Sequence, residues 1–253
     1  MINVVYSFAA SQFSLEYIES KINHSVLWES HCHSQFEMIA VAEGDVSVML
    51  EGENYRLKEN NILIVPPLQY HTVTANGEGI YRRITALFDL SAIPSVLWDE
   101  FQKSDTGIEF SCPSSIEKIK DVCLRDNSEF YAPLIKSLMT EIFYEAAEDR
   151  QRLTVKETDE FLQKALKYID AHLHEKILLD DLALHTARSK SSFCHLFFEK
   201  MQVSPKQYIL QKKLAMAQKL LDEGIPRTEV AIRLGYTNYS NFYRLYKKNK
   251  TQT

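Results

Sequence analysis

No apolar run in this 253-residue sequence approaches the roughly 18 residues that a helix needs to cross a lipid bilayer. Residues 1–10 also lack the basic segment and the long apolar core of a secretory signal, so we expect a cytoplasmic protein with no membrane partner. Cysteine is scarce: Cys32, Cys112, Cys123 and Cys194 are scattered, and none has CxxC spacing. Isolated thiols are typical of a reducing compartment and argue against a disulfide or zinc framework.

The charged residues divide the chain into two unlike halves. Residues 1–150 hold 11 Lys and Arg against 23 Asp and Glu, whereas residues 151–253 hold 18 against 11. A basic half can neutralise phosphates, and an acidic half avoids them. The length suits two modest domains. The uneven charge alone does not show whether the basic half binds nucleic acid or whether the asymmetry is accidental. The sequence motifs must decide between these two interpretations.

The first 90 or so residues predict a β-sheet protein. Short, β-rich apolar runs occur at residues 36–41, 46–50 and 62–65, and turn-forming residues separate them. Many short strands at close spacing favour a sandwich or a barrel.

Helical periodicity follows the strands. One helix is predicted to begin near residue 113, and a longer one is predicted from about residue 128 to residue 149. The longer helix carries an apolar stripe formed by Leu134, Ile135, Leu138, Met139, Ile142 and Phe143. We expect part of the stripe to pack on the barrel, and a second subunit is the alternative partner. The polar residues 147–155 make the best linker.

The chain after Thr154 is predicted to be helical, and it contains an imperfect repeat with a spacing of about fifty residues. The first copy joins residues 181–183 to an apolar stripe at 193–197, and the second joins 229–231 to a stripe at 242–246. A long helix is predicted between the two copies.

Each copy has the parts of a helix-turn-helix unit. Small Ala183 or Ala231 lets a second helix pack closely, and a tight turn follows. Gly235 can take the left-handed conformation that ends a helix, and Ser189 or Asn238 can cap the next one. The residues between the inward stripes must then point outward, where such a face can enter a major groove of DNA.

The predicted DNA-contacting residues are Lys190, Ser191, Ser192, Cys194 and His195 in the first copy and Asn238, Tyr239, Ser240, Asn241, Arg244 and Lys247 in the second. Arg244 is the best candidate for a base contact because its guanidinium suits guanine, and Lys247 is expected to bind phosphate. A single exposed arginine taken alone is more often merely solvated.

Six segments together resemble the DNA-binding domain of AraC-type transcription regulators: residues 178–183, 193–200, 203–208, 214–221, 230–236 and 240–248. The resemblance covers about 100 residues. It implies two helix-turn-helix units, joined by a long helix, in successive major grooves on one face of the DNA. Two departures stand out: the family usually has a basic residue where this chain has His195, and the chain stops at Thr253, which implies reduced packing behind the second unit.

The N-terminal half contains a possible metal or effector site. On a strand, His31 and His33 would face the same side, and Glu37 can join them. Together with His71 they form a set of three His and one carboxylate, which can bind a divalent transition metal. The spacing resembles the metal motifs of cupins, which are small β-barrels. It also resembles the sensor domain of many AraC-type regulators, where a His-x-His and a nearby Glu commonly recur without metal. The alternatives to a metal site are polar residues that line an effector pocket, or hydrogen bonds that fix the barrel mouth.

A small polar metabolite such as a sugar would fit a barrel of this kind. The candidate effector-binding residues are Trp28, His31, His33, Glu37, Tyr70 and His71. Trp28 can stack on a sugar ring, or it can belong to the core.

We therefore predict an α+β protein with a cupin-like barrel at 1–110, a helical dimerisation and linker region at 111–153, and an all-α double helix-turn-helix domain at 154–253. The favoured function, by this resemblance, is an effector-responsive bacterial transcription activator, not an enzyme. It would act as a homodimer on double-stranded promoter DNA and contact RNA polymerase. The alternatives are a metal-dependent cupin enzyme with an accessory helical domain, and a constitutive DNA-binding protein whose barrel only dimerises. The second unit is expected to read bases more clearly than the first.

Overall fold

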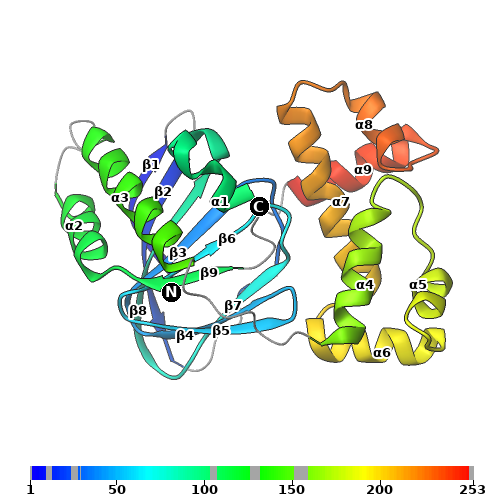
Figure 1. The fold of residues 1–253 in the computed structure, drawn as a ribbon, viewed down its shortest axis with the longest axis horizontal. Helices are drawn as coiled ribbons and strands as arrows, with labels where there is room; N and C mark the ends of the chain where they lie inside the picture. The colour runs from blue at the N-terminus through cyan, green and yellow to red at the C-terminus, as the bar shows by residue number, and fades with distance from the viewer. Residues whose placement is uncertain are drawn as a thin grey trace.

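The computed structural model describes residues 2–9, 13–23, 28, 30–102, 107–125, 132–150 and 159–250. Two antiparallel sheets form the N-terminal part (Figure 1). The larger has the strand order β1 (Ile2–Ala9), β2 (Phe13–Ile22), β8 (Gly79–Phe88), β3 (Phe36–Glu43), β6 (Asn61–Val65) and β9 (Ile108–Ser111). The smaller has the order β5 (Glu53–Lys58), β4 (Asp45–Leu50) and β7 (His71–Ala75).

The larger sheet is buried on both faces along β3. Side chains alternate along a strand, so Met38 and Ala40 join one core while Ile39 and Val41 join another. The second core lies between the two sheets, where it meets residues of β4 and β5. Burial on both faces explains why the sequence of this strand reads as a continuous apolar run.

Helices α1 (Trp98–Gln102), α2 (Pro113–Cys123) and α3 (Ala132–Arg150) cover the other face of the larger sheet (Figure 1). Two short 3₁₀ turns, η1 (Leu90–Ala92) and η2 (Ser95–Leu97), precede them. Of the six residues in the predicted stripe, only Leu134 is exposed, at 43%. The stripe therefore packs mostly against the barrel, and little of its apolar surface remains exposed for contact with a second subunit.

The predicted linker at 147–155 begins too early. Helix α3 continues to Arg150, and Ala147 is buried in the same core as the stripe. Residues 151–155 lie outside the described part of the chain.

The C-terminal part consists of α4 (Glu160–Ala171), α5 (Leu179–His185), α6 (Lys190–Met201), α7 (Pro205–Asp222), α8 (Arg227–Arg233) and α9 (Tyr239–Lys250). It lies on the opposite side of the sheets from α2 and α3 (Figure 1). Phe193, Phe197 and Tyr208 anchor the core of the first unit, and Phe242 and Tyr246 anchor that of the second. In the described parts of the chain, no helix is both long and apolar enough to span a membrane.

Local chemistry sets the two turns as the sequence predicts. Ser189 Oγ accepts a hydrogen bond from Ser192 N at the start of α6. Asn238 Oδ1 accepts from Ser240 N, at 2.9 Å, before α9. The turn before α9 needs Gly235, which has a φ of +74°.

Candidate functional site

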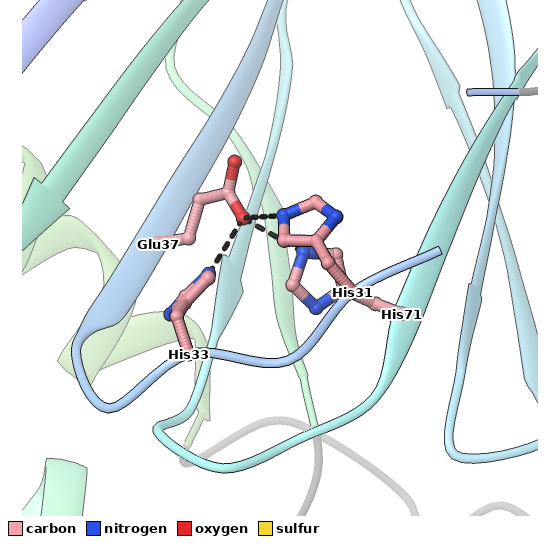
Figure 2. A group of neighbouring side chains, drawn as sticks. All are labelled: His31, His33, Glu37 and His71. Atoms are coloured by element: carbon pink, nitrogen blue, oxygen red, sulfur yellow. Dashed lines mark hydrogen bonds and ion pairs between the residues drawn. The ribbon is translucent and has the colours of Figure 1, made fainter. Parts of the chain in front are cut away.

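Three histidines surround one oxygen of Glu37 (Figure 2). The Nε2 atoms of His71, His33 and His31 lie 2.8, 3.0 and 3.8 Å from Glu37 Oε2. Glu37 is on β3 and His71 begins β7. His31 and His33 do not lie on a regular strand as expected. They lie on the segment before β3, where the backbones of His31 and His71 exchange hydrogen bonds of 3.0 and 3.1 Å.

The far sides of two rings are fixed by the backbone. His33 Nδ1 lies 2.8 Å from the carbonyl oxygen of Gln35, and His71 Nδ1 lies 3.0 Å from that of Gln69. A carbonyl only accepts, so both Nδ1 atoms carry a proton. In a neutral ring of this tautomer, Nε2 keeps a lone pair that can share a proton with Glu37 or bind a metal ion.

The charges of this network reinforce one another. Burial alone would raise the pKa of Glu37, but hydrogen bonds from His33 and His71 outweigh it and hold that pKa well below its usual range. Burial likewise opposes the charged form of His71, and the Glu37 carboxylate more than offsets this, so the pKa of His71 is raised. The four possible ligand atoms lie within 4.8 Å of one another, which fits one divalent transition metal ion.

A cavity of about 730 Å³ opens beside this cluster. Trp28, His31, His33 and Glu37, all predicted to bind an effector, lie on its wall. The predicted residues Tyr70 and His71 are buried and are not among the residues that line it. Tyr70 instead packs against Tyr208, with ring centroids 5.4 Å apart, in the core of the first helix-turn-helix unit.

The DNA-binding half supplies the remaining wall of the cavity, which the sequence did not reveal. The residues are Gln211, Leu214, Ala215 and Gln218 of α7 and Tyr246 of α9. Arg83 of β8 also lines the cavity and was missed. Its signal was the alternation of β8, whose residues Ile84 and Ala86 pack under the helices and so turn Arg83 to the other face.

A buried ion network joins the two halves next to this cavity. Glu51, at the turn between β4 and β5, accepts hydrogen bonds from Tyr208 Oη at 2.6 Å and Lys212 Nζ at 3.2 Å. Lys212 also pairs with Asp170, at 2.8 Å, and its side chain is only 2% exposed. Burial opposes the charge of Lys212, but Glu51 and Asp170 outweigh it, and the pKa of Lys212 is raised. The following residue, Gly52, packs directly on Leu162 of α4.

The predicted DNA-contacting residues lie on α6 and α9 or at their first turns. Most of them are exposed, whereas Ser192 and Cys194 are half-buried, and Cys194 packs against the core of the first unit. Lys190 pairs with Asp180 at 3.0 Å, and Arg244 Nη2 donates to Asn241 Oδ1 at 3.1 Å. The predicted contact residues thus lie largely on the exposed faces of the two helices.

A second buried lysine ties the two helix-turn-helix units together. Lys213 Nζ donates to the carbonyl oxygens of Glu175, at 2.5 Å, and Leu234, at 2.6 Å. Glu175 follows α4 in the first unit, and Leu234 ends α8 in the second. Next to Leu234, Gly235 approaches the Glu175 backbone so closely that a Cβ would lie 2.5 Å from Glu175 Cα. This contact fixes how α6 and α9 are oriented relative to each other.

Sequence profiles agree with this two-part architecture. The profile of an AraC-like ligand binding domain matches residues 12–157, more than half of the chain, and a helix-turn-helix domain profile matches residues 182–253. The chain belongs to the AraC family of transcriptional regulators. The His31 cluster and Arg83 lie in its ligand-binding domain, and α6 and α9 lie in its DNA-binding domain.

Relatives of this AraC-type regulator carry matching descriptions. YobQ of Bacillus subtilis (strain 168), an HTH-type transcriptional regulator, is 24% identical over 239 residues, which cover 92% of this chain and 90% of YobQ. YdiP of Escherichia coli (strain K12), also an HTH-type transcriptional regulator, is 28% identical over 92 residues, covering 36% of this chain and 30% of YdiP. Apo ToxT from Vibrio cholerae aligns with a TM-score of 0.48 and 10% identity over 94% of each chain. Family membership gives no support to the alternative of a cupin enzyme.

Proposed function

We propose that this AraC-type regulator activates transcription by coupling the binding of an effector in the cavity to the binding of promoter DNA. In this proposal the protein is not an enzyme. One observation carries the proposal: the same cavity is lined by the barrel residues His31 and His33 and by Gln211 and Gln218 of α7. A molecule bound there contacts the sensor and the helix that joins the two helix-turn-helix units. Its binding therefore favours one arrangement of the two halves over another.

A cavity-filling variant tests this coupling without knowledge of the effector. DNA selected from a random pool by the wild-type chain gives the probe. Gln211→Trp places a large side chain in the cavity, and we expect it to change the affinity for that DNA by about fivefold or more. Lys219→Trp, on an exposed part of the same helix, is the control. Equal affinities in the two variants would support a constitutive DNA-binding protein instead.

The same proposal includes two partners: the protein acts as a homodimer, and it contacts RNA polymerase. The barrel buries most of the predicted stripe, so a dimer surface on α3 would use Leu134 and Tyr144, which are 43% and 46% exposed. Sedimentation at micromolar concentration, with and without selected DNA, tests this state, and a monomer in both conditions would contradict it. Transcription by purified RNA polymerase from a promoter with the selected site distinguishes activation from repression.

A divalent transition metal bound by His31, His33, Glu37 and His71 is a second candidate property of the sensor. The observation in its favour is the fixed Nδ1–H of His33 and His71, which turns both Nε2 atoms toward Glu37. Such an ion would offer open positions to a hydroxyl or carboxylate of the effector. Elemental analysis of protein purified without chelators should find about one metal ion per chain. The double variant with His31→Ala and His33→Ala should contain none. A metal-free wild type would leave the hydrogen-bonded network as the structural role of these residues.

A further inference from the structure

Two neighbouring arginines of β8 have opposite surroundings. Arg82 points away from the cavity and forms ion pairs with Glu19 and Glu43. Arg83 lines the cavity, and no carboxylate among the described residues pairs with it. Its Nη1 is buried, and no described residue gives it a hydrogen-bond partner. Among the described residues, Arg82 thus has two carboxylate partners, whereas Arg83 on the cavity wall has none.

Two aromatic rings hold Arg83 in place, while its Nη1 has no acceptor among the described residues. The guanidinium carbon lies 5.1 Å from the ring centroid of Trp28 and 5.3 Å from that of Tyr81. These cation–π contacts orient the guanidinium, but a ring face is a poor substitute for an oxygen acceptor. Trp28 Nε1 is also buried and unpartnered, and the backbone N–H of Trp28 is fixed to Val73 O at 3.0 Å. Two donors from residues that line one cavity therefore lack an acceptor in the described part of the chain.

We propose that the effector is an organic carboxylate whose anionic group binds Arg83 and Trp28 Nε1, an inference that rests on the cavity being the effector site. Buried donors of this kind are normally satisfied, and a carboxylate supplies two acceptor oxygens that match a guanidinium. The bound anion adds the charge partner that Arg83 lacks. Its binding also reduces the cost of burying both donors.

The rest of the wall defines what else the ligand carries. Ile18, Ile39 and Leu87 add apolar surface to the barrel side of the wall, which can take an apolar part of the ligand. Arg83 is the only lysine or arginine on the described wall, whereas Glu16 and Glu37 are both on it, so a monoanion fits better than a phosphate dianion. The guanidinium already occupies one side of the Trp28 ring, which disfavours a stacked sugar, one of the two roles that the sequence leaves open for Trp28.

Matched pairs of acids and amides test the charge requirement. The chain has two tryptophans, so a Trp98→Phe background makes Trp28 the single fluorescent reporter. We expect benzoate and hexanoate to change Trp28 fluorescence saturably and to bind at least about tenfold more tightly than benzamide and hexanamide. Arabinose tests binding of a neutral sugar, and inorganic phosphate tests binding of a dianion. Tighter binding of either one, or equal binding of acids and amides, would overturn the proposal, and so would the absence of saturable acid binding.

Arginine variants assign the effect to one side chain. Arg83→Gln should abolish the preference for acids, whereas Arg82→Gln should retain it. Arg83→Lys keeps the positive charge but loses the paired N–H donors of the guanidinium, so it should retain only part of the preference for acids over amides. A preference that persists in Arg83→Gln, with thermal unfolding like that of the wild type, would overturn the assignment. Titration of the selected DNA on the same samples separates the two proposals, because acid binding that leaves DNA affinity unchanged contradicts the coupling and not the anion site.

Discussion

Glu51 and Tyr208 are separated by 157 residues in the chain, yet their side chains form a hydrogen bond of 2.6 Å between the barrel and α7. Lys212, one turn further along α7, joins the same carboxylate. These contacts place the turn between β4 and β5 against the helix that links the two DNA-binding units. The sensor thus holds the DNA-binding half through a small, specific set of groups.

Removal of the carboxylate should loosen this interface. In Glu51→Ala, Lys212 stays buried with Asp170 as its remaining ion-pair partner among the described residues, and breaking a buried pair typically costs about 3–5 kcal/mol. We expect the free energy of unfolding in urea to fall by about 3 kcal/mol, or the two halves to separate, with a larger radius of gyration in solution scattering. Glu59→Ala, at an exposed glutamate after β5, is the control. If both variants unfold and scatter alike, the network does not hold the halves together.

The neighbouring glycine gives a sharper test of the same interface. Gly52→Ala and Gly77→Ala impose almost the same backbone strain, since φ is +84° and +86° at the two positions. Only Gly52 faces another part of the chain, where a Cβ would overlap the buried Leu162 Cδ2. We expect Gly52→Ala to be less stable than Gly77→Ala by about 1–3 kcal/mol in thermal or urea unfolding. Equal losses would mean that Leu162 yields freely.

The contact between the two helix-turn-helix units should control binding to a complete operator. Gly235→Ala would force the second turn away from the Glu175 backbone, whereas Gly224→Ala, at φ +84°, meets no atom within 4 Å. We expect only Gly235→Ala to weaken binding to the full selected site while binding to the half-site of the first unit is retained. Fluorescence anisotropy on full and half sites measures the difference. Parallel losses on both sites would show general unfolding instead.

Substitutions of two residues of α9 should distinguish base recognition from phosphate binding. Arg244→Ala should cost about 1–3 kcal/mol and relax specificity at one base position, because a guanidinium reads guanine through two hydrogen bonds. Lys247→Ala should weaken all sequences alike and reduce the steepness of the log–log salt dependence by about 0.9. Affinities on a panel of single-base operator variants at several salt concentrations decide the matter. If both substitutions act identically on every site, the role assigned to Arg244 is wrong.

The two DNA-binding units could be predicted in detail because their signals are local. Ser189, Asn238 and Gly235 act within a few residues of themselves, and the Phe193 and Phe242 stripes follow helical periodicity. The β-rich runs were equally clear, since burial on both faces leaves a continuous apolar pattern. Local signals of this kind survive without any knowledge of tertiary contacts.

The site between the halves could not be predicted, because its partners are distant in the chain. Lysines of a helix are normally exposed, yet Lys212 and Lys213 are only 1% and 7% exposed. Tyr70 is a candidate effector-binding residue in the sequence, but it packs in the core of the first helix-turn-helix unit instead. Sequence patterns show which residue types can be buried, but not which distant segment will cover them.

Three consecutive positions of α7 thus serve three different neighbours. Gln211 lines the cavity, Lys212 joins the barrel turn, and Lys213 joins the second helix-turn-helix unit. Successive side chains on a helix are about 100° apart, so one short segment can face three directions. In a genetic selection for regulators that work without their inducer, the codons for these three residues should therefore be frequent sites of mutation, although none of them was predicted to contact DNA.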